Sequence, residues 1–243
     1  MGSDLTHGTH TMPDKPYAAS DCGHRKCSVC CTVGEGVGST SRRSATAEEL
    51  RELIIAASTE LIQESGLSGL SAREIARRIN YSPGTLYNSF ENLDDLVLTI
   101  EGRLLDDLLG ALAAVPKAGD ARERVHKLAR CYLAFAWNNP KLWNLLFEHH
   151  IPLERSVPES YRKKFEALMS KVEDALRPLS QGMGAEDLKR SARVLWAGMH
   201  GISTLSATDK LSIITESDAN ELMDDLVRNY LNGFEDPALR KAV

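Results

Sequence analysis

Three polar side chains near position 86 are spaced so that they can form hydrogen bonds with one large ligand. They are Thr85, Tyr87 and Asn88. Leu86 and Phe90, four residues apart, should turn to the other side and pack inward. A phenol can donate to a phosphate, whereas a hydroxyl or a carboxamide can bind the edge of a base. Whether these side chains contact nucleic acid depends on the elements that present them.

Two short helices joined by a tight turn would present these side chains. Ser71 and Glu74 have the spacing of a capping box, so a helix should begin there. Ser82 can cap a second helix, with Pro83 at its first position. The first helix has one apolar face, formed by Ala72, Ile75, Ala76 and Ile79. A helix, a short turn and a second short helix together form the unit that places a helix N-terminus in the major groove of DNA.

A third helix should complete this unit. Thr46 and Glu49 have capping-box spacing, and Gly66 provides a left-handed stop. The apolar residues between them follow helical spacing and are Leu50, Leu53, Ile54, Ala57 and Leu61. This stripe predicts the surface on which the two shorter helices pack.

The same stretch resembles the N-terminal domain of the TetR family of bacterial transcriptional regulators. It spans residues 47–96 and reads AEELRELIIAASTELIQESGLSGLSAREIARRINYSPGTLYNSFENLDDL. Its most specific part is the run from Ile75 to Phe90. The resemblance implies a DNA-binding helix-turn-helix, followed by helices that form a homodimer and sense a small molecule. Family members often carry a phosphate-binding lysine where Leu93 stands, so that contact is not carried over.

The predicted DNA contacts combine this resemblance with the chemistry of the side chains. Tyr87 matches the family tyrosine that donates to a backbone phosphate. Ser71 and Ser82 lie at predicted helix N-termini, where free amides favour a phosphate. Arg73 is the expected contact among the three arginines of its helix, and two arginines upstream could reach a phosphate or the minor groove. The full set is Arg42, Arg43, Ser71, Arg73, Ser82, Thr85, Tyr87 and Asn88. Each of these residues alone could also be an ordinary exposed polar side chain.

The rest of the chain also follows helical spacing. Asn92 and Asp95 cap a helix of about twenty residues, which the resemblance makes the lever between ligand and DNA. Five further helices are predicted over 120–137, from 140 to before 152, and over 161–176, 188–202 and 222–234. The fold class is therefore all-α, with a three-helix helix-turn-helix domain over 44–92 and a helical bundle of about six helices over 93–243.

Aromatic residues in this second part allow two interpretations. Trp196, His200 and Gly201 resemble the signature of a TetR subgroup whose C-terminal domain is called WHG. Trp196 and His200 share one helical face, so they either line a ligand cavity or form a core, with Gly201 allowing close helix packing. The core interpretation is favoured, because aromatic stripes at helical spacing are usually core. His149 and His150 could simply cap a helix. The ligand-pocket candidates are Tyr132, Phe135, Trp143, Phe147, Trp196, Met199 and His200.

The first 43 residues have no helical or strand period and are predicted to be a disordered tail. Four cysteines lie there: Cys22, Cys27, Cys30 and Cys31. One CxxC spacing is a possible half-site for zinc, but the second half is missing. The favoured interpretation is a leader with reduced thiols, so no metal or cofactor is predicted.

Composition limits the remaining choices. The chain of 243 residues carries a net charge of −5, which argues against a protein that coats nucleic acid without specificity. No run is long and apolar enough to span a membrane and no signal pattern is present, so a cytoplasmic protein without a membrane partner is expected. The predicted function is a homodimeric regulator, most simply a repressor, that binds a palindromic DNA operator and a small-molecule effector. The alternatives are a protein-interaction adaptor that no longer binds DNA, and an all-α enzyme that uses one of the histidines; no catalytic constellation supports the enzyme.

Overall fold

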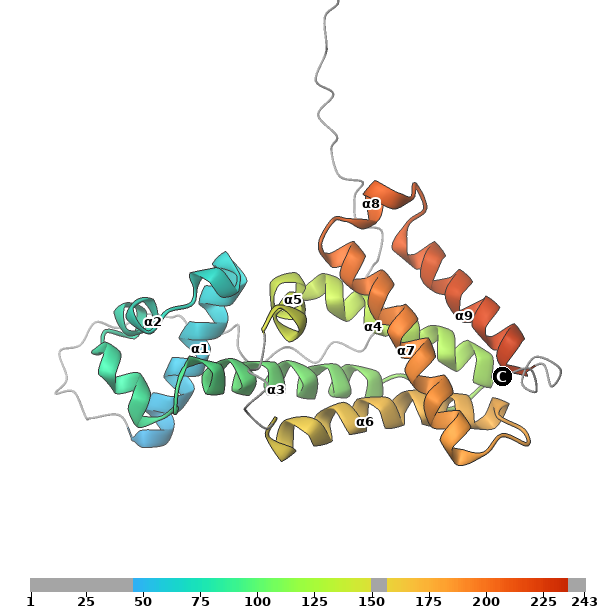
Figure 1. Cartoon of the computed structure of the whole chain (residues 1–243), viewed down its shortest axis with the longest axis horizontal. Coiled ribbons are helices and arrows are strands. Elements are labelled where there is room, and N and C mark those ends of the chain that lie inside the picture. The colour runs from blue at the N-terminus through green and yellow to red at the C-terminus, as the bar shows by residue number, and fades with distance from the viewer. Residues whose placement is uncertain (1–45, 150–156, 236–243) are drawn as a thin grey trace, which may run out of the picture. The chain divides into compact units, whose positions relative to one another are not determined.

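The structure, a computed structural model, describes residues 46–149 and 157–235 of the chain (Figure 1). These residues form helices joined by turns, and no strand occurs among them. The elements in chain order are α1 (Ala47–Ser65), η1 (Leu67–Gly69), α2 (Ala72–Ile79), η2 (Pro83–Asn88), α3 (Leu93–Ala113), α4 (Ala121–Asn138), α5 (Pro140–Glu148), α6 (Glu159–Leu176), η3 (Arg177–Leu179), α7 (Ala185–Ala207), α8 (Leu211–Ile214) and α9 (Ala219–Glu235). The predicted all-α fold is confirmed.

Local capping sets where the principal N-terminal helices begin. Thr46 accepts a hydrogen bond from the Glu49 amide at 3.2 Å, and the Glu49 carboxylate accepts one from the Thr46 amide at 2.8 Å. Asn92 caps α3 in the same way, through the amide of Asp95 at 3.0 Å. These side chains satisfy amides that have no partner inside the helix. Gly66, with φ +74°, ends α1 in a backbone region that favours glycine.

Two predictions about the first three helices were wrong in detail. Leu53 is 41% exposed, because the buried face of α1 is turned toward Ile55 and Ile62 instead. The element after Ser82 is a six-residue 3-10 helix, and the Ser82 side chain does not cap it. Its hydroxyl lies 2.9 Å from that of Thr85. A helix this short depends on its neighbours rather than on its own hydrogen bonds.

The first core lies under α1, α2, η2 and the N-terminal half of α3. Ile54, Ile62, Ile75 and Leu86 are almost fully buried in it. Leu93 packs against the same core, which accounts for an apolar residue where the family often has lysine. This core orients the helix-turn-helix on the long helix α3.

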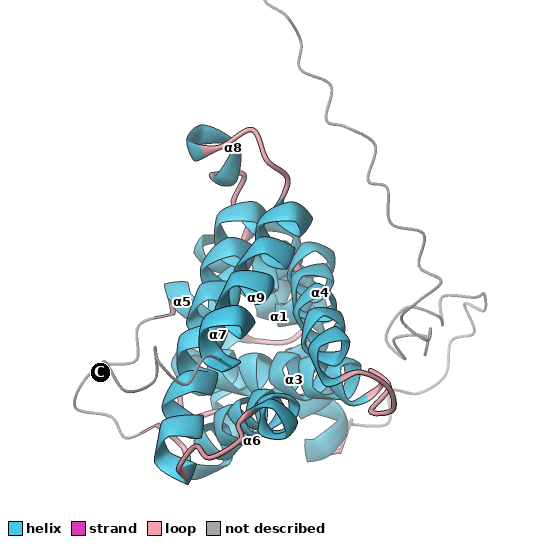
Figure 2. Ribbon diagram, turned by 90° about the vertical axis from the view of Figure 1, so that its right-hand side faces the viewer, coloured by secondary structure: helices cyan, strands magenta, loops and turns pink. Residues whose placement is uncertain are grey.

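The second core lies among the C-terminal half of α3 and helices α4, α6, α7 and α9. Helix α7 packs against α4, α6 and α9, and the views of Figures 1 and 2 agree on this arrangement. The short helix α8 was not predicted; Leu211 is its buried residue. Helix α5 belongs to both cores, since Leu142 and Leu145 lie in the first and Trp143 in the second. None of the described helices is long and apolar enough to cross a bilayer.

Candidate nucleic-acid interface

The predicted reading residues lie on the exposed side of η2. Leu86 and Phe90 are 1% and 3% exposed, so they anchor η2 in the first core as expected. Tyr87 is 55% exposed, and Asn88 is also exposed. Thr85 is half-buried, and its hydroxyl is engaged by Ser82. The phenol and the carboxamide are therefore the two predicted reading groups that face outward without a competing partner among the described residues.

Of the two serines predicted to cap helices, Ser71 does so and Ser82 does not. Ser71 caps α2, because its Oγ accepts from the Glu74 amide at 3.2 Å. A phosphate there would meet the remaining free amides of α2. Ser82 precedes a six-residue 3-10 helix, which is too short to present a comparable dipole. The helix-dipole argument for a phosphate is therefore weaker at Ser82 than at Ser71, and the contact of Ser82 with DNA stays a prediction.

Arg51 of α1 holds the end of η2, a role that sequence reasoning missed. One guanidinium nitrogen donates to the Ser89 carbonyl at 2.8 Å, and its Cζ lies 4.2 Å from the centroid of the Phe90 ring. A cation over an aromatic ring and a charged hydrogen bond each stabilise the contact. No local motif marks Arg51, since its partner lies 38 positions away in sequence.

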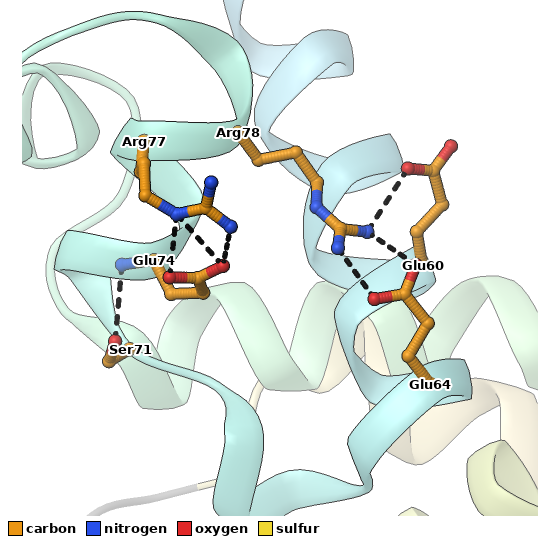
Figure 3. Close-up of polar contacts among 6 residues, drawn as sticks. All are labelled: Glu60, Glu64, Ser71, Glu74, Arg77 and Arg78. Carbon is orange, nitrogen blue, oxygen red and sulfur yellow. Dashed lines mark hydrogen bonds and ion pairs between the residues drawn. The ribbon is translucent and has the colours of Figure 1, made fainter.

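The three arginines of α2 have different surroundings, and Figure 3 shows those of Arg77 and Arg78. Arg78 binds Glu64 of α1 at 2.8 and 2.5 Å, with Glu60 at 3.4 Å. Arg77 pairs inside α2 with Glu74, at 3.0 and 3.2 Å from Nε to the two carboxylate oxygens. These hydrogen bonds hold the pKa of both Glu64 and Glu74 below its usual range. Arg73 is exposed and makes no side-chain hydrogen bond or ion pair within the described residues.

The remaining predicted DNA contacts and the cysteine cluster have no described position in the structure. Arg42 and Arg43 lie outside the described residues, as do Cys22, Cys27, Cys30 and Cys31. The acidic residues near η2 are partly used in local structure, since Asp95 accepts from the Glu91 amide at 3.1 Å. The candidate interface among the described residues thus combines Arg73, the start of α2, Tyr87 and Asn88.

Six of the seven ligand-pocket candidates meet in the second core. Phe147 lies in α5, but its side chain is outside the described residues. Trp196 and His200 stack with ring centroids 5.3 Å apart, and the Tyr132 and Phe135 rings contact Trp143 edge-on. Trp143 is fully buried and Met199 is 3% exposed. The rings therefore pack on one another as a core does.

A continuous hydrogen-bond network runs through these rings. The Trp196 indole donates to the Tyr132 hydroxyl at 3.0 Å, and this hydroxyl lies 3.1 Å from Nδ1 of His200. Nε2 of His200 lies 3.0 Å from the hydroxyl of Thr204, which accepts from the Trp143 indole at 3.3 Å. Burial lowers the pKa of His200 to about 4 and raises that of Tyr132. Both groups are therefore neutral at pH 7.

His149, predicted as a possible helix cap or, in the enzyme alternative, as an acid–base group, contributes to a different buried cluster. Its Nδ1 lies 3.1 Å from the carboxylate of Glu101 on α3, and its Nε2 lies 3.5 Å from that of Asp94. Glu101 is 2% exposed and also accepts a hydrogen bond from Tyr161 of α6. Burial raises the pKa of Glu101, and these partners oppose the rise. The cluster ties α5 and α6 to the long helix.

Sequence comparisons match both parts of the chain. The family model described as bacterial regulatory proteins of the tetR family matches residues 54–100. The model described as tetracyclin repressor-like, C-terminal domain, matches residues 125–230. A helix-turn-helix joined to such a C-terminal domain defines a DNA-binding transcriptional regulator. The chain belongs to the TetR family. Membership of the WHG subgroup stays a prediction.

Individual relatives agree with this assignment. The chain is 26% identical over 225 residues to Rv0681, an uncharacterized HTH-type transcriptional regulator of Mycobacterium tuberculosis, covering 92% of this chain and 95% of that protein. It is 27% identical over 161 residues to the HTH-type transcriptional activator FasR of Mycolicibacterium smegmatis, covering 66% and 71%.

Solved structures are similar over most of their length. A Rhodococcus sp. RHA1 protein of unknown function has a TM-score of 0.64 and 25% identity, covering 77% of this chain and 96% of that one. Thermus thermophilus FadR, a TetR-family repressor in complex with lauroyl-CoA, has a TM-score of 0.56 and 25% identity, covering 77% and 97%.

Proposed function

We propose that this regulator binds a palindromic operator as a homodimer and releases or engages it in response to a small molecule, most simply as a cytoplasmic repressor. The observation that carries this proposal is the exposure of Tyr87 and Asn88 on η2, with Leu86 fixed beneath them. Tyr87 would hold a phosphate, and Asn88 would bind a base edge, for which adenine is the best fit.

A dimer follows from the small reading surface of one chain. One short helix contacts few base pairs, and a two-fold pair reads half-sites about 34–36 Å apart. We place the interface on α7 and α9, as the family resemblance implies. Val194 is 56% exposed on α7, and a Cβ added at Gly201 would meet no atom within 4 Å. Within the chain it is Gly198 that permits close packing, since a Cβ there would lie 2.9 Å from Leu226. The packing role predicted for Gly201 is therefore wrong within one chain, and its open surface suits a second copy.

The effector is proposed to act near the aromatic network of the second core. Thermus thermophilus FadR was solved with lauroyl-CoA, which makes acyl thioesters the first class to test on this chain. The network here is closely packed and its polar groups are paired. A ligand that entered would have to separate rings such as Trp143 and His200. Such a ligand shifts the DNA affinity only if it prefers one arrangement of the rings to the other.

The test begins with capture of genomic fragments by the purified full-length protein. The recovered sequences should share a palindrome, and binding to it should weaken steeply as salt rises. Acyl-CoA esters of graded chain length are then added to the complex. If no fragment is enriched over a random pool at moderate salt, the DNA-binding regulator is wrong and the adaptor alternative gains. If an operator is found but no acyl-CoA changes binding, only that effector class is excluded.

A further inference from the structure

Two neighbouring arginines of α2 make ion pairs of different kinds. Arg78 is 24% exposed and reaches across to Glu64 and Glu60, so it fastens α2 to α1. Arg77 is 70% exposed, and its one ion-pair partner among the described residues is Glu74, one turn earlier on the same helix. Releasing Arg78 would loosen the contact between two helices. Releasing Arg77 would leave the packing of α2 unchanged, so Arg77 is the arginine that can exchange its partner.

Glu74 is placed differently from its counterpart in α1. Both helices begin with a hydroxyl residue followed three positions later by glutamate. In α1 the glutamate returns to the backbone, since Glu49 accepts from the Thr46 amide at 2.8 Å. In α2 the Ser71 hydroxyl caps the Glu74 amide, but the structure shows no return bond, and the carboxylate binds Arg77 instead (Figure 3). The carboxylate is therefore not needed to close the cap.

The Arg77 side chain continues the face of α2 that bears Arg73. Residues four apart are neighbours on a helix surface, so Arg73 and Arg77 lie along one line from the helix N-terminus. Arg73 is exposed and unpaired within the described residues, and it is the predicted phosphate contact. A DNA backbone that ran along Arg73 and Arg77 would bring its next phosphate to the Arg77 guanidinium. That phosphate would lie beside the carboxylate of Glu74.

We propose that Glu74 competes with DNA phosphate for Arg77 and so attenuates the affinity of this regulator for the DNA backbone. A guanidinium binds carboxylate and phosphate with the same two-pronged geometry, so the two ligands exclude each other. If Arg77 exchanges Glu74 for a phosphate, the Glu74 carboxylate is left unpaired beside that phosphate. Repulsion between the two negative groups then opposes DNA binding. Glu74 is thus a positioning residue that acts through Arg77. The inference rests on the proposed DNA-binding function.

The test is the salt dependence of operator binding by Glu74→Gln. Each phosphate neutralised adds about 0.9 to the slope of log K against log salt. If the freed Arg77 gains one phosphate, the slope should steepen by about 0.9. The ratio of variant to wild-type affinity should then rise about 3.5-fold on going from 200 to 50 mM salt. The double variant Glu74→Gln/Arg77→Gln should have the wild-type slope.

A matched control separates this effect from the loss of one negative charge. Asp174→Asn removes a carboxylate from an exposed pair of the same spacing, between Asp174 near the end of α6 and Arg177 at the start of η3, and should leave the slope unchanged. Circular dichroism checks that each variant folds, and Glu74→Ser replaces the glutamine variant if that one melts early. A wild-type slope in a folded Glu74 single variant, or an equal change in Asp174→Asn, overturns the inference. If the wild-type protein binds no operator, the proposed function has failed instead.

Discussion

The Tyr132 hydroxyl connects two aromatic side chains of the second core, those of Trp196 and His200. Its removal tests whether the aromatic network is a core or a ligand site. It accepts from the Trp196 indole at 3.0 Å and lies 3.1 Å from Nδ1 of His200. Tyr132 itself is 2% exposed. Tyr132→Phe keeps the ring and its edge contact with Trp143, whose centroid is 5.0 Å away. The change therefore removes two hydrogen bonds and little else.

The expected cost follows from the groups left behind. A buried polar group without a partner costs about 1–3 kcal/mol. Trp196 and His200 are half-buried, so the loss of the hydrogen bond to Tyr132 should cost each of them an amount near the lower limit of this range. We expect Tyr132→Phe to lower the free energy of unfolding by about 2–3 kcal/mol. Tyr230→Phe is the matched control, because it removes one hydroxyl that donates to the Ser191 carbonyl at 2.6 Å, and it should cost about 1 kcal/mol.

The assay is urea unfolding followed by circular dichroism at a fixed protein concentration. An unchanged m-value with a lower midpoint would show that stability alone has changed. If Tyr132→Phe is as stable as the wild-type protein, or loses no more than Tyr230→Phe, the network does not stabilise the core. A selective loss of effector response at unchanged stability would then support the ligand-site interpretation.

Other predictions concern the DNA contacts, the dimer and pH. Tyr87→Phe should weaken binding about equally on all DNA sequences, whereas Asn88→Ala should relax preference at one base position by about 1–3 kcal/mol; a panel of single-base operator variants decides both. Gly201→Leu should keep the chain folded, gaining about 0.5–1 kcal/mol in helix propensity, but should yield a monomer in analytical ultracentrifugation; a stable dimer would exclude this face. The lowered pKa of His200 means that stability is full above about pH 6.5 and falls as the pH drops toward 4. The full shift corresponds to about 3 kcal/mol, which partial exposure reduces to about 1–2 kcal/mol. His200→Gln should lose less stability over that range, and parallel pH profiles would contradict this reasoning.

The fold could be predicted wherever its causes are local. The caps at Thr46, Ser71, Asn92 and Asp120 join a side chain to an amide three residues on, so the sequence spacing is the physical cause. The 3-10 geometry of η2 was missed because a short helix takes its shape from the surface it packs against. Helix α8 was missed for a similar reason, since four residues carry no periodic signal.

The candidate site was predictable in its orientation but not in its electrostatics. The spacing of Leu86 and Phe90 was enough to place Tyr87 outside, and the structure confirms that exposure. The pairing of Arg78 with Glu64 could not be read from the sequence, because the two residues come from different helices, 14 positions apart. The same holds for Glu101 and His149, which lie 48 positions apart. Contacts of this kind depend on how helices pack, which spacing along one helix does not reveal.

Helix α5 offers a route from the second core to the DNA-reading unit that does not run along the long helix. Its Trp143 donates to Thr204 within the aromatic network, so a ligand that separated those rings would act directly on this helix. One residue earlier in α5, Leu142 lies in the first core, and Lys141 donates to the carbonyl of Glu64 at the end of α1. The Glu64 carboxylate in turn holds Arg78 of α2. Because close-packed cores resist compression, a displacement of α5 must be passed on to α1 or absorbed by loss of these contacts. Either outcome changes how firmly α2 is held, so the lever predicted for α3 need not act alone.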